Sequence, residues 1–369
     1  MAIHLTRLSC ACALGRTNDE VLSAYTAGTS GLREIEGDIP GRKIYFGRVP
    51  GGLPAVDEPE FKMRANQLLK LAVSNFKDDL DAFFVRHDAA RVAIVLGASN
   101  TGVDEAQRHV DAWLETGAKP EAMFFSQLEL GTPADYLKKL LGVKGPAFVV
   151  STACSSSAKA FASARRLIEL GLVDAAIVGG VDGRCRFAMN GFHALGALSQ
   201  GVCRPLAPDR DGINLGEGVA LFLMEKEAFS PSPLYPVPVL LAGCGESSDA
   251  YHATAPDPEG RGAEAAMRAA LAEAQLAPAD VAYVNLHGTG TPANDSMEMR
   301  AVARVFPCGV EVESTKHLMG HCLGAAGALE AAICWLLLAT GRVKGATMSN
   351  SFAFGGSNAS VVLTAGEGR

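Results

Sequence analysis

One cysteine follows an apolar run at a point where a strand is expected to give way to a helix. Residues 148–150 are apolar, and Cys154 lies shortly after them, ahead of a segment, 155–170, whose apolar residues fall on one helical face. Unpaired amides at a helix start and the positive end of the helix dipole favour thiolate over thiol, so the position predicts a nucleophile. The chain has nine cysteines, however, and a cysteine taken alone is more often a small buried apolar residue.

Three further polar side chains follow other apolar runs. His287 lies in NLHGTGTPAND, and Lys316 and His321 lie in STKHLMGHCLGAAG. Because the C-terminal ends of parallel strands meet at the ligand crevice of an α/β sheet, one site shared with Cys154 is expected. Either histidine alone is read equally well as a hydrogen-bonded loop residue, and the glycines beside them serve turns as readily as ligands.

Alternating strands and helices are predicted to position these groups. Strand, helix, strand at the observed spacing predicts right-handed parallel crossovers. The proline-rich stretch 230–238 separates two parts of similar pattern, 1–233 and 234–369. The predicted strands are 91–99, 148–151, 174–181, 218–225, 239–244, 281–286 and 360–364. The predicted helices are 155–170, 262–275, 295–305 (capped by Asp295) and 323–340, and a short segment, 310–314, lies between the last two helices.

Composition narrows the class of protein. The 369 residues are 48% apolar and 20% charged, which predicts a large core arranged as two domains or two fused halves. A net charge of -7 without a basic stripe argues against nucleic acid as the main partner. Scattered cysteines without C-x-x-C spacing disfavour a metal site and fit reduced thiols. No signal peptide is recognised, and the apolar run 323–339 contains Glu330 and is short for a membrane span, so a cytoplasmic protein is expected.

Taken together, the motifs resemble the β-ketoacyl-acyl-carrier-protein synthases of the elongating type, condensing enzymes of the thiolase superfamily. The matching segments follow the family's order over nearly the whole chain, which makes the resemblance specific. They are STACSSS around Cys154, GFHALGALS from Gly191, CRPLAPDRDGINLGEG from Cys203, SSDAYHATAPDPEG from Ser247, NLHGTGTPAND around His287, STKHLMGH with Lys316 and His321, and NSFAFGGSN with Phe354.

The resemblance implies the thiolase fold, an α/β architecture of five αβαβα layers built from two pseudo-repeated halves. The half 1–233 would carry the nucleophilic cysteine, and the half 234–369 would carry the two histidines and the lysine. The implied reaction is a decarboxylative Claisen condensation of an acyl thioester on Cys154 with malonyl-acyl-carrier protein, giving a 3-oxoacyl-carrier protein. No cofactor is implied, since the substrates ride on the phosphopantetheine of the carrier protein.

The family also implies roles for individual residues. Alternatives from the residues alone remain open: Glu330 as a solvent-facing carboxylate, Phe354 as a core aromatic, and the basic residues as ordinary solvated surface. The implied roles are decarboxylation and enolate binding by His287 and His321, their organisation by Lys316 and Glu330, an oxyanion hole from the amides of Cys154 and Phe354, gating by Phe354, pantetheine binding by Thr289 and Thr291, and carrier-protein contacts by Lys62, Arg64, Lys70 and Arg204.

The chain departs from the family pattern in two ways. The segments 198–203 and 341–348 and the N-terminal third are shorter, which points to a specialised line such as aryl polyene or polyketide synthesis rather than housekeeping fatty-acid synthesis. Such a synthase would form a homodimer or a heterodimer with a homologous chain-length factor. Ala353 stands where the family usually has glycine, and because a positive φ is costly for alanine, a stiffer gate is predicted.

Two other functions are weighed against the elongating synthase. A thiolase-type acyltransferase needs a second catalytic cysteine where His321 stands, and the neighbouring Cys322 would point elsewhere on a helix. A non-catalytic chain-length factor has the same fold but lacks the nucleophile. The joint presence of Cys154, His287 and His321 favours the elongating synthase over both.

Overall fold

Ten of the described strands form one sheet in the order β11-β10-β12-β13-β9-β1-β8-β6-β4-β5. The computed structural model describes residues 2–226 and 233–366. The ten strands fall into two groups of five. The groups are joined where β1 pairs with β9, through His4 and Leu240. The first group comprises β1 (His4–Ala11), β4 (Val92–Gly97), β5 (Ala147–Val150), β6 (Ala175–Asp182) and β8 (Gly218–Glu225), and the second β9 (Val239–Ser248), β10 (Val281–Asn285), β11 (Glu311–Glu313), β12 (Ala346–Phe352) and β13 (Ser357–Ala365).

Both groups of strands have the same topology. Counted along the chain, each runs third, second, fourth, fifth, first across the sheet. In each group the second strand is parallel to the third and fourth, and the fifth is antiparallel to the fourth and first. The two halves are therefore structural repeats. The division at residue 233 stays a prediction, and residues 230–232 of the proline-rich stretch lie outside the described part.

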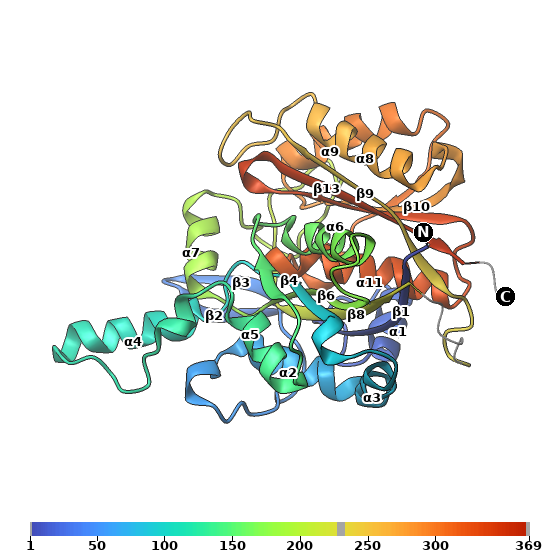
Figure 1. Cartoon of the computed structure of the whole chain (residues 1–369). Coiled ribbons are helices and arrows are strands. Elements are labelled where there is room, and N and C mark those ends of the chain that lie inside the picture. The colour runs from blue at the N-terminus through green and yellow to red at the C-terminus, as the bar shows by residue number, and fades with distance from the viewer. Residues whose placement is uncertain (1, 227–232, 367–369) are drawn as a thin grey trace.

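Helices form three layers around these strands (Figure 1). Two helices lie in the middle and contact strands of both halves. One of them, α11, is apolar around its circumference except at Glu330, and all its residues are buried, as in a central helix. The middle helices are α6 (Ser156–Glu169) and α11 (Ala326–Ala339), the outer helices on the C-terminal strands are α8 (Arg261–Ala274) and α9 (Pro292–Val305), and those on the N-terminal strands are α2 (Arg64–Asn75), α3 (Lys77–Arg86) and α5 (Thr132–Leu141).

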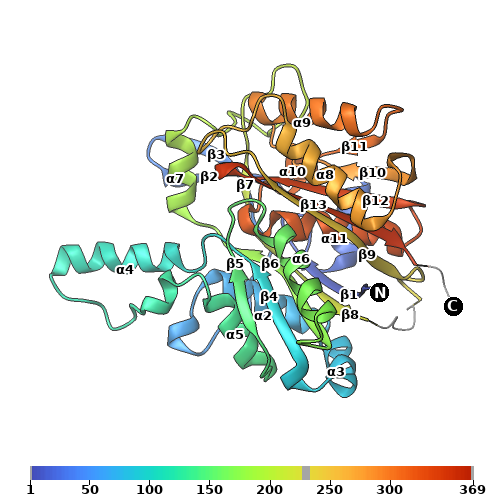
Figure 2. The same cartoon turned by 45° about the horizontal axis from the view of Figure 1, so that its top comes forward.

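Smaller elements decorate the N-terminal half. Helix α4 extends away from the body (Figure 2). Helix α7 and a three-stranded sheet, β2-β3-β7, share an apolar cluster near the site described below. These elements are α1 (Asn18–Thr26), β2 (Leu32–Ile39), β3 (Arg42–Gly47), α4 (Val103–Thr116), α7 (Arg186–Ala194) and β7 (Leu215–Gly216). The remaining described elements are the short helix α10 (Lys316–Met319) and the 3-10 turns η1 (Pro59–Phe61), η2 (Ala89–Arg91), η3 (Phe125–Leu128), η4 (Pro278–Asp280), η5 (Leu323–Ala325) and η6 (Phe354–Gly356).

The predicted elements are largely present, with two corrections. Strands β4, β5 and β6 are parallel as predicted, whereas β8 is antiparallel to β6. The prediction that Asp295 caps its helix is wrong, because α9 begins earlier, at Pro292, and the side chain of Thr291 accepts the capping hydrogen bond from the Asn294 amide. Within the described residues, no helix combines the length and apolar character that a membrane crossing needs.

Candidate active site

Cys154 lies in the turn between β5 and α6, as the sequence predicts. The residue before it, Ala153, adopts a left-handed conformation with φ 53°, which is unusual for a residue with a Cβ. The hydroxyl of Ser156, in the first turn of α6, accepts a hydrogen bond from the Thr152 amide at 2.9 Å and closes this turn. The backbone therefore holds the thiol in one place, two residues ahead of the helix.

His321 contacts the thiol directly. Its Nε2 lies 3.0 Å from Cys154 Sγ, although the two residues are far apart in sequence. The main chain of His321 pairs with the N-terminal half: its amide donates to the Asn214 carbonyl at 2.7 Å, and its carbonyl accepts from the Gly216 amide at 3.0 Å. The imidazole position is thus set by backbone contacts as well as by the thiol.

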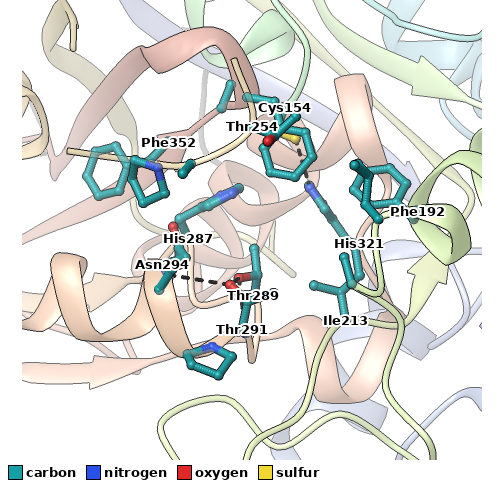
Figure 3. Close-up of a pocket in the computed structure, with 18 of the residues that line it drawn as sticks. Cys154, Phe192, Ile213, Thr254, His287, Thr289, Thr291, Asn294, His321 and Phe352 are labelled. Atoms are coloured by element: carbon teal, nitrogen blue, oxygen red, sulfur yellow. Dashed lines mark hydrogen bonds between the residues drawn. The ribbon is translucent and has the colours of Figure 1, made fainter. Parts of the chain in front are cut away.

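His287 completes the group from the end of β10. Its ring lies nearly perpendicular to that of His321, with 5.3 Å between ring centroids (Figure 3). The buried carboxylate of Glu298 on α9 accepts hydrogen bonds from the amides of His287 and Gly288, both at 2.8 Å. This carboxylate fixes the turn that directs the imidazole into the space below Cys154.

Burial shifts the pKa of the thiol and of both imidazoles. It raises the pKa of the Cys154 thiol to about 11, against the opposing effects of the Lys316 ammonium and the Phe354 amide. Burial, followed by the Lys316 charge, lowers the pKa of His287 and of His321 well below the usual value. Both rings are neutral at pH 7. The thiolate that the helix start was expected to favour is thus opposed by burial of the thiol.

Lys316 and Glu330 form a buried ion pair behind the histidines. The Lys316 ammonium contacts the Glu330 carboxylate, and the two residues are 1% and 0% exposed. Burial raises the pKa of Glu330 to about 7, and the neighbouring ammonium opposes that rise. Glu330 therefore does not face solvent, and the Lys316 ammonium of this pair acts on the thiol and on both imidazoles.

Two backbone amides approach the thiol. The amides of Phe354 and Cys154 both lower the pKa of the thiol, against the larger effect of burial. Phe354 begins the turn η6, is 37% exposed, and packs its ring against Phe192 with 5.6 Å between centroids. It is therefore a surface aromatic at the cavity rather than a core residue. The proposed oxyanion and gating roles are compatible with this placement.

Ala353 does not strain the turn that carries Phe354. Its φ is -96° and its ψ 157°, an extended conformation that alanine adopts freely. The positive φ angles fall on the next glycines instead, Gly355 at 81° and Gly356 at 77°. The cause given for a stiffer gate, a strained alanine, is therefore absent.

A cavity of about 340 Å³ connects these groups to the surface. Thr289 and Thr291 lie on its wall, and their hydroxyls are 2.9 Å apart (Figure 3). Apolar side chains from α7 and the following loop, Phe192 and Leu195 among them, line another part. A narrow chain carrying amide groups could pass the threonines and reach Cys154, so the pantetheine role stays a sound prediction.

The predicted carrier-protein contacts differ in exposure and in the groups that they contact, and their role stays a prediction. Lys62 is exposed beside a second hollow that also contains Glu105. Lys70 is half-buried, with its Nζ 2.6 Å from a backbone oxygen of Ala55. Arg204 is exposed and pairs with Asp209.

Arg64, the fourth predicted contact, has a structural role. Its guanidinium makes a two-point contact with the fully buried carboxylate of Glu217. The same carboxylate accepts from the amides of Val49 and Arg184, each at 3.1 Å. Because removing Arg64 would leave a buried charge short of partners, its effect on a carrier protein cannot be separated from folding.

The thiol and the two imidazoles also form a set of possible metal ligands. One ligand atom from each of Cys154, His287 and His321 lies within 4.8 Å of the others. One thiolate and two imidazoles suit zinc, but the neighbouring Lys316 charge opposes a divalent cation at this point. The absence of a resident metal stays a prediction.

Two acidic residues at the site were missed by sequence reasoning. Glu298 holds the His287 turn, and Asp295 joins two loops by accepting hydrogen bonds from the Gly290 amide at 3.1 Å and the Leu206 amide at 2.8 Å. Both lie one or two turns into α9, on its buried side. Acidic residues among the buried positions of an otherwise amphipathic helix are the signal that would have revealed them.

Comparisons with known proteins agree with this geometry. The family description "Beta-ketoacyl synthase, N-terminal domain" matches residues 78–229, and "Beta-ketoacyl synthase, C-terminal domain" matches residues 239–347. Nodulation protein E of Rhizobium leguminosarum bv. trifolii is 34% identical over 74% of this chain and 75% of its own length. The 3-oxoacyl-[acyl-carrier-protein] synthase 2 of Vibrio harveyi is 32% identical over 78% of each chain.

A solved structure matches almost throughout. A chain from the complex of the ketosynthase ApeO with its chain length factor ApeC from Xenorhabdus doucetiae is 40% identical, with a TM-score of 0.91. The match covers 99% of this chain and 98% of that one. The predicted thiolase fold is thereby confirmed. In sequence and in fold, the chain belongs to the β-ketoacyl synthase family.

Proposed function

We propose that the protein catalyses decarboxylative condensation of an acyl thioester with a malonyl thioester, both delivered by an acyl-carrier protein. The observation that carries this proposal is the contact of Cys154 Sγ with His321 Nε2 at 3.0 Å, with His287 beside it. A nucleophile and two neutral imidazoles at the end of one cavity are the parts that such a reaction needs.

The first step transfers the acyl chain to the protein. Cys154 sulfur attacks the thioester carbonyl, the carbon–sulfur bond to the phosphopantetheine breaks, and the carrier thiol leaves with the proton. The amides of Cys154 and Phe354 would stabilise the tetrahedral oxyanion, an effect of about 3 to 4 kcal/mol per donor in other enzymes. Because burial disfavours free thiolate in the resting protein, proton removal is expected to accompany attack.

The second step joins the two carbon units. The malonyl carbon–carboxylate bond breaks, carbon dioxide leaves, and the electron pair stays on an enolate whose oxygen accepts hydrogen bonds from His287 and His321. Their Nδ1 atoms have no hydrogen-bond partner among the described residues, which favours placing the ring proton on Nε2. The enolate carbon then attacks the Cys154 thioester, and the carbon–sulfur bond breaks to release the 3-oxoacyl product. The Cys154 sulfur leaves with the electron pair and takes up a proton from water, which restores the thiol.

The two alternative functions fit the site less well. For a thiolase-type acyltransferase, Cys322 would have to act, but it is buried outside the cavity lining, with its sulfur 3.7 Å from a backbone oxygen of Gly320. A non-catalytic chain-length factor would not need a Cys154 thiol in contact with the His321 imidazole. Both observations favour the condensing enzyme.

An assembly with a second ketosynthase-like chain is part of the proposal. Strand β5 is the last in the sheet order, and its Phe148 is 37% exposed. Apolar side chains on nearby elements are also exposed, including Leu114 at 80% and Phe125 at 66%. The high similarity to a ketosynthase and chain-length-factor complex favours a homologous partner and a specialised polyketide-type pathway. Acyl-carrier protein is the second partner, with Lys62, Lys70 and Arg204 as candidate contacts.

The proposal is tested by incubating the protein with acylated carrier protein and measuring intact mass. The protein should gain the mass of the acyl group on Cys154, and the Cys154→Ala variant should not. Malonyl-carrier protein should then convert the acylated protein to free enzyme and a 3-oxoacyl-carrier protein. A folded wild-type chain that stays unacylated with every carrier tested, alone or with a partner chain, would contradict the enzyme assignment.

A further inference from the structure

Asp182 is a buried carboxylate that the proposed mechanism does not use. It ends β6 and has no exposed surface. Its Oδ1 accepts from the amides of Asn100 at 2.8 Å and Ser99 at 3.0 Å, and its Oδ2 from the Gly324 amide at 2.6 Å and the Ser99 hydroxyl at 2.9 Å. The side chain therefore joins the ends of β4 and β6 to a segment of the C-terminal half.

That segment directly follows His321. Gly324 lies in the turn η5, which connects the histidine to α11. The turn contains Leu323 with φ 50°, a conformation that a leucine keeps only where its surroundings hold it. The short hydrogen bond from Gly324 to Asp182 supplies such a restraint one residue further on.

The packing shows that Gly324 is fitted to this carboxylate. A Cβ at Gly324 would lie 2.7 Å from Asp182 Oδ2 and 2.7 Å from the carbonyl carbon of Ala98. Any larger residue would push the turn away from the end of β4. On the other side of His321, backbone pairing with Asn214 and Gly216 fixes the chain. The backbone is therefore held at His321 itself and again at Gly324, in the turn that follows.

We propose that Asp182 is a positioning residue that holds His321 in register with Cys154 by anchoring the Gly324 amide. This role rests on the proposed function, since it concerns the decarboxylation and condensation that His321 serves. The carboxylate acts through backbone amides and does not touch substrate. Its loss should therefore lower turnover without weakening substrate binding at the distant cavity mouth.

The test is Asp182→Asn, which keeps the shape but turns one acceptor into an N–H donor facing other donors. Carbon dioxide release from malonyl-carrier protein and condensation are measured over a range of substrate concentrations. A fall of about 100-fold in kcat with KM unchanged is expected, as for a reacting group displaced by about 1 Å. The control is Glu225→Gln. Glu225 is a buried residue of β8, the neighbour of β6, and lies at the end of that strand away from Asp182. This variant should lose stability but keep kcat within about twofold.

A milder variant covers the case in which Asp182→Asn does not fold. Ser99→Ala removes one hydroxyl donor to Oδ2 and should lower kcat about threefold, again without a change in KM. Turnover equal to wild type in the folded Asp182 variant, or in Ser99→Ala where the first does not fold, overturns the positioning role. Failure of the proposed function shows differently, as a wild-type protein that itself releases no carbon dioxide.

Discussion

The two halves of the molecule share a topology but place different chemistry at corresponding points. In the N-terminal half, the turn before the middle helix α6 carries Cys154; in the C-terminal half, the turn before α11 carries His321. Each turn also contains a non-glycine residue in the left-handed region, Ala153 in one and Leu323 in the other. One fold motif thus presents the nucleophile from one side and an imidazole from the other.

The strand ends beside these turns differ more strongly. In the C-terminal half, the second strand leads to His287 and the fourth to Phe354, both of which face the cavity. In the N-terminal half, the corresponding ends carry Ser99 and Asp182, which bind each other. One repeat therefore supplies both imidazoles and the Lys316–Glu330 pair, while the other supplies the Cys154 thiol and the carboxylate that binds the Gly324 amide.

The buried ion pair under the histidines belongs to the C-terminal half alone, and breaking it gives the largest expected effect. Lys316→Ala leaves the Glu330 carboxylate buried without a partner and should lower the free energy of unfolding by about 3 to 5 kcal/mol. Chemical denaturation measures the change. Condensation should fall as well, because the ammonium near Cys154 is lost.

An exposed pair provides the matched control. Lys77 and Asp81 form an ion pair on α3 with both side chains more than half exposed, so Lys77→Ala should change the free energy of unfolding by less than about 0.5 kcal/mol. Similar losses in the two variants would show that the buried pair contributes no more than a surface pair.

The pH dependence of thiol reactivity tests whether burial controls the charge of Cys154. Because burial raises the pKa of Cys154 to about 11, the thiolate fraction should grow about tenfold per pH unit between pH 7 and 10. Alkylation of the empty protein by iodoacetamide, followed by mass spectrometry with Cys154→Ala as background, should show that rise. A rate that levels off by pH 8.5 would mean that the helix start and Lys316 outweigh burial.

The turn that carries Phe354 gives the smallest expected effect. Since Ala353 is in an extended conformation, Ala353→Gly should cost about 0.5 to 1 kcal/mol of stability through the unfolded chain and leave condensation within about twofold. Gly355→Ala is the matched variant in the same turn. The Gly355 φ of 81° disfavours alanine, and an added Cβ would contact nothing, so only the backbone conformation is tested. Several-fold faster turnover in Ala353→Gly would instead show that the alanine does stiffen the gate.

Much of the fold could be read from the sequence because its signals are local. Apolar runs such as 218–225 predicted strands, and the spacing of Cys154 and the following helix predicted the turn between them. The antiparallel direction of β8 could not be read, since an apolar strand buried on both faces looks the same in either direction.

The sequence predicted the thiol, both imidazoles and the ion pair behind them, but not the carboxylates that hold the surrounding backbone. Cys154, His287 and His321 are brought together as expected, but the rise in the Cys154 pKa depends on burial that only the packed structure reveals. Asp182 and Glu298 bind backbone amides from distant segments, and no local pattern announces such a contact. The same holds for Arg64, whose partner Glu217 is far away in sequence, and its predicted contact with a carrier protein stays a prediction.

The division of work between the halves is tested most directly by carbon dioxide release from malonyl-carrier protein, measured in Cys154→Ala and in His287→Ala. The account predicts that Cys154→Ala still releases carbon dioxide while forming no 3-oxoacyl product. It predicts that His287→Ala releases carbon dioxide about 100-fold or more slowly, while its Cys154 still accepts the acyl group. Loss of carbon dioxide release in Cys154→Ala, or its retention in His287→Ala, would contradict the account.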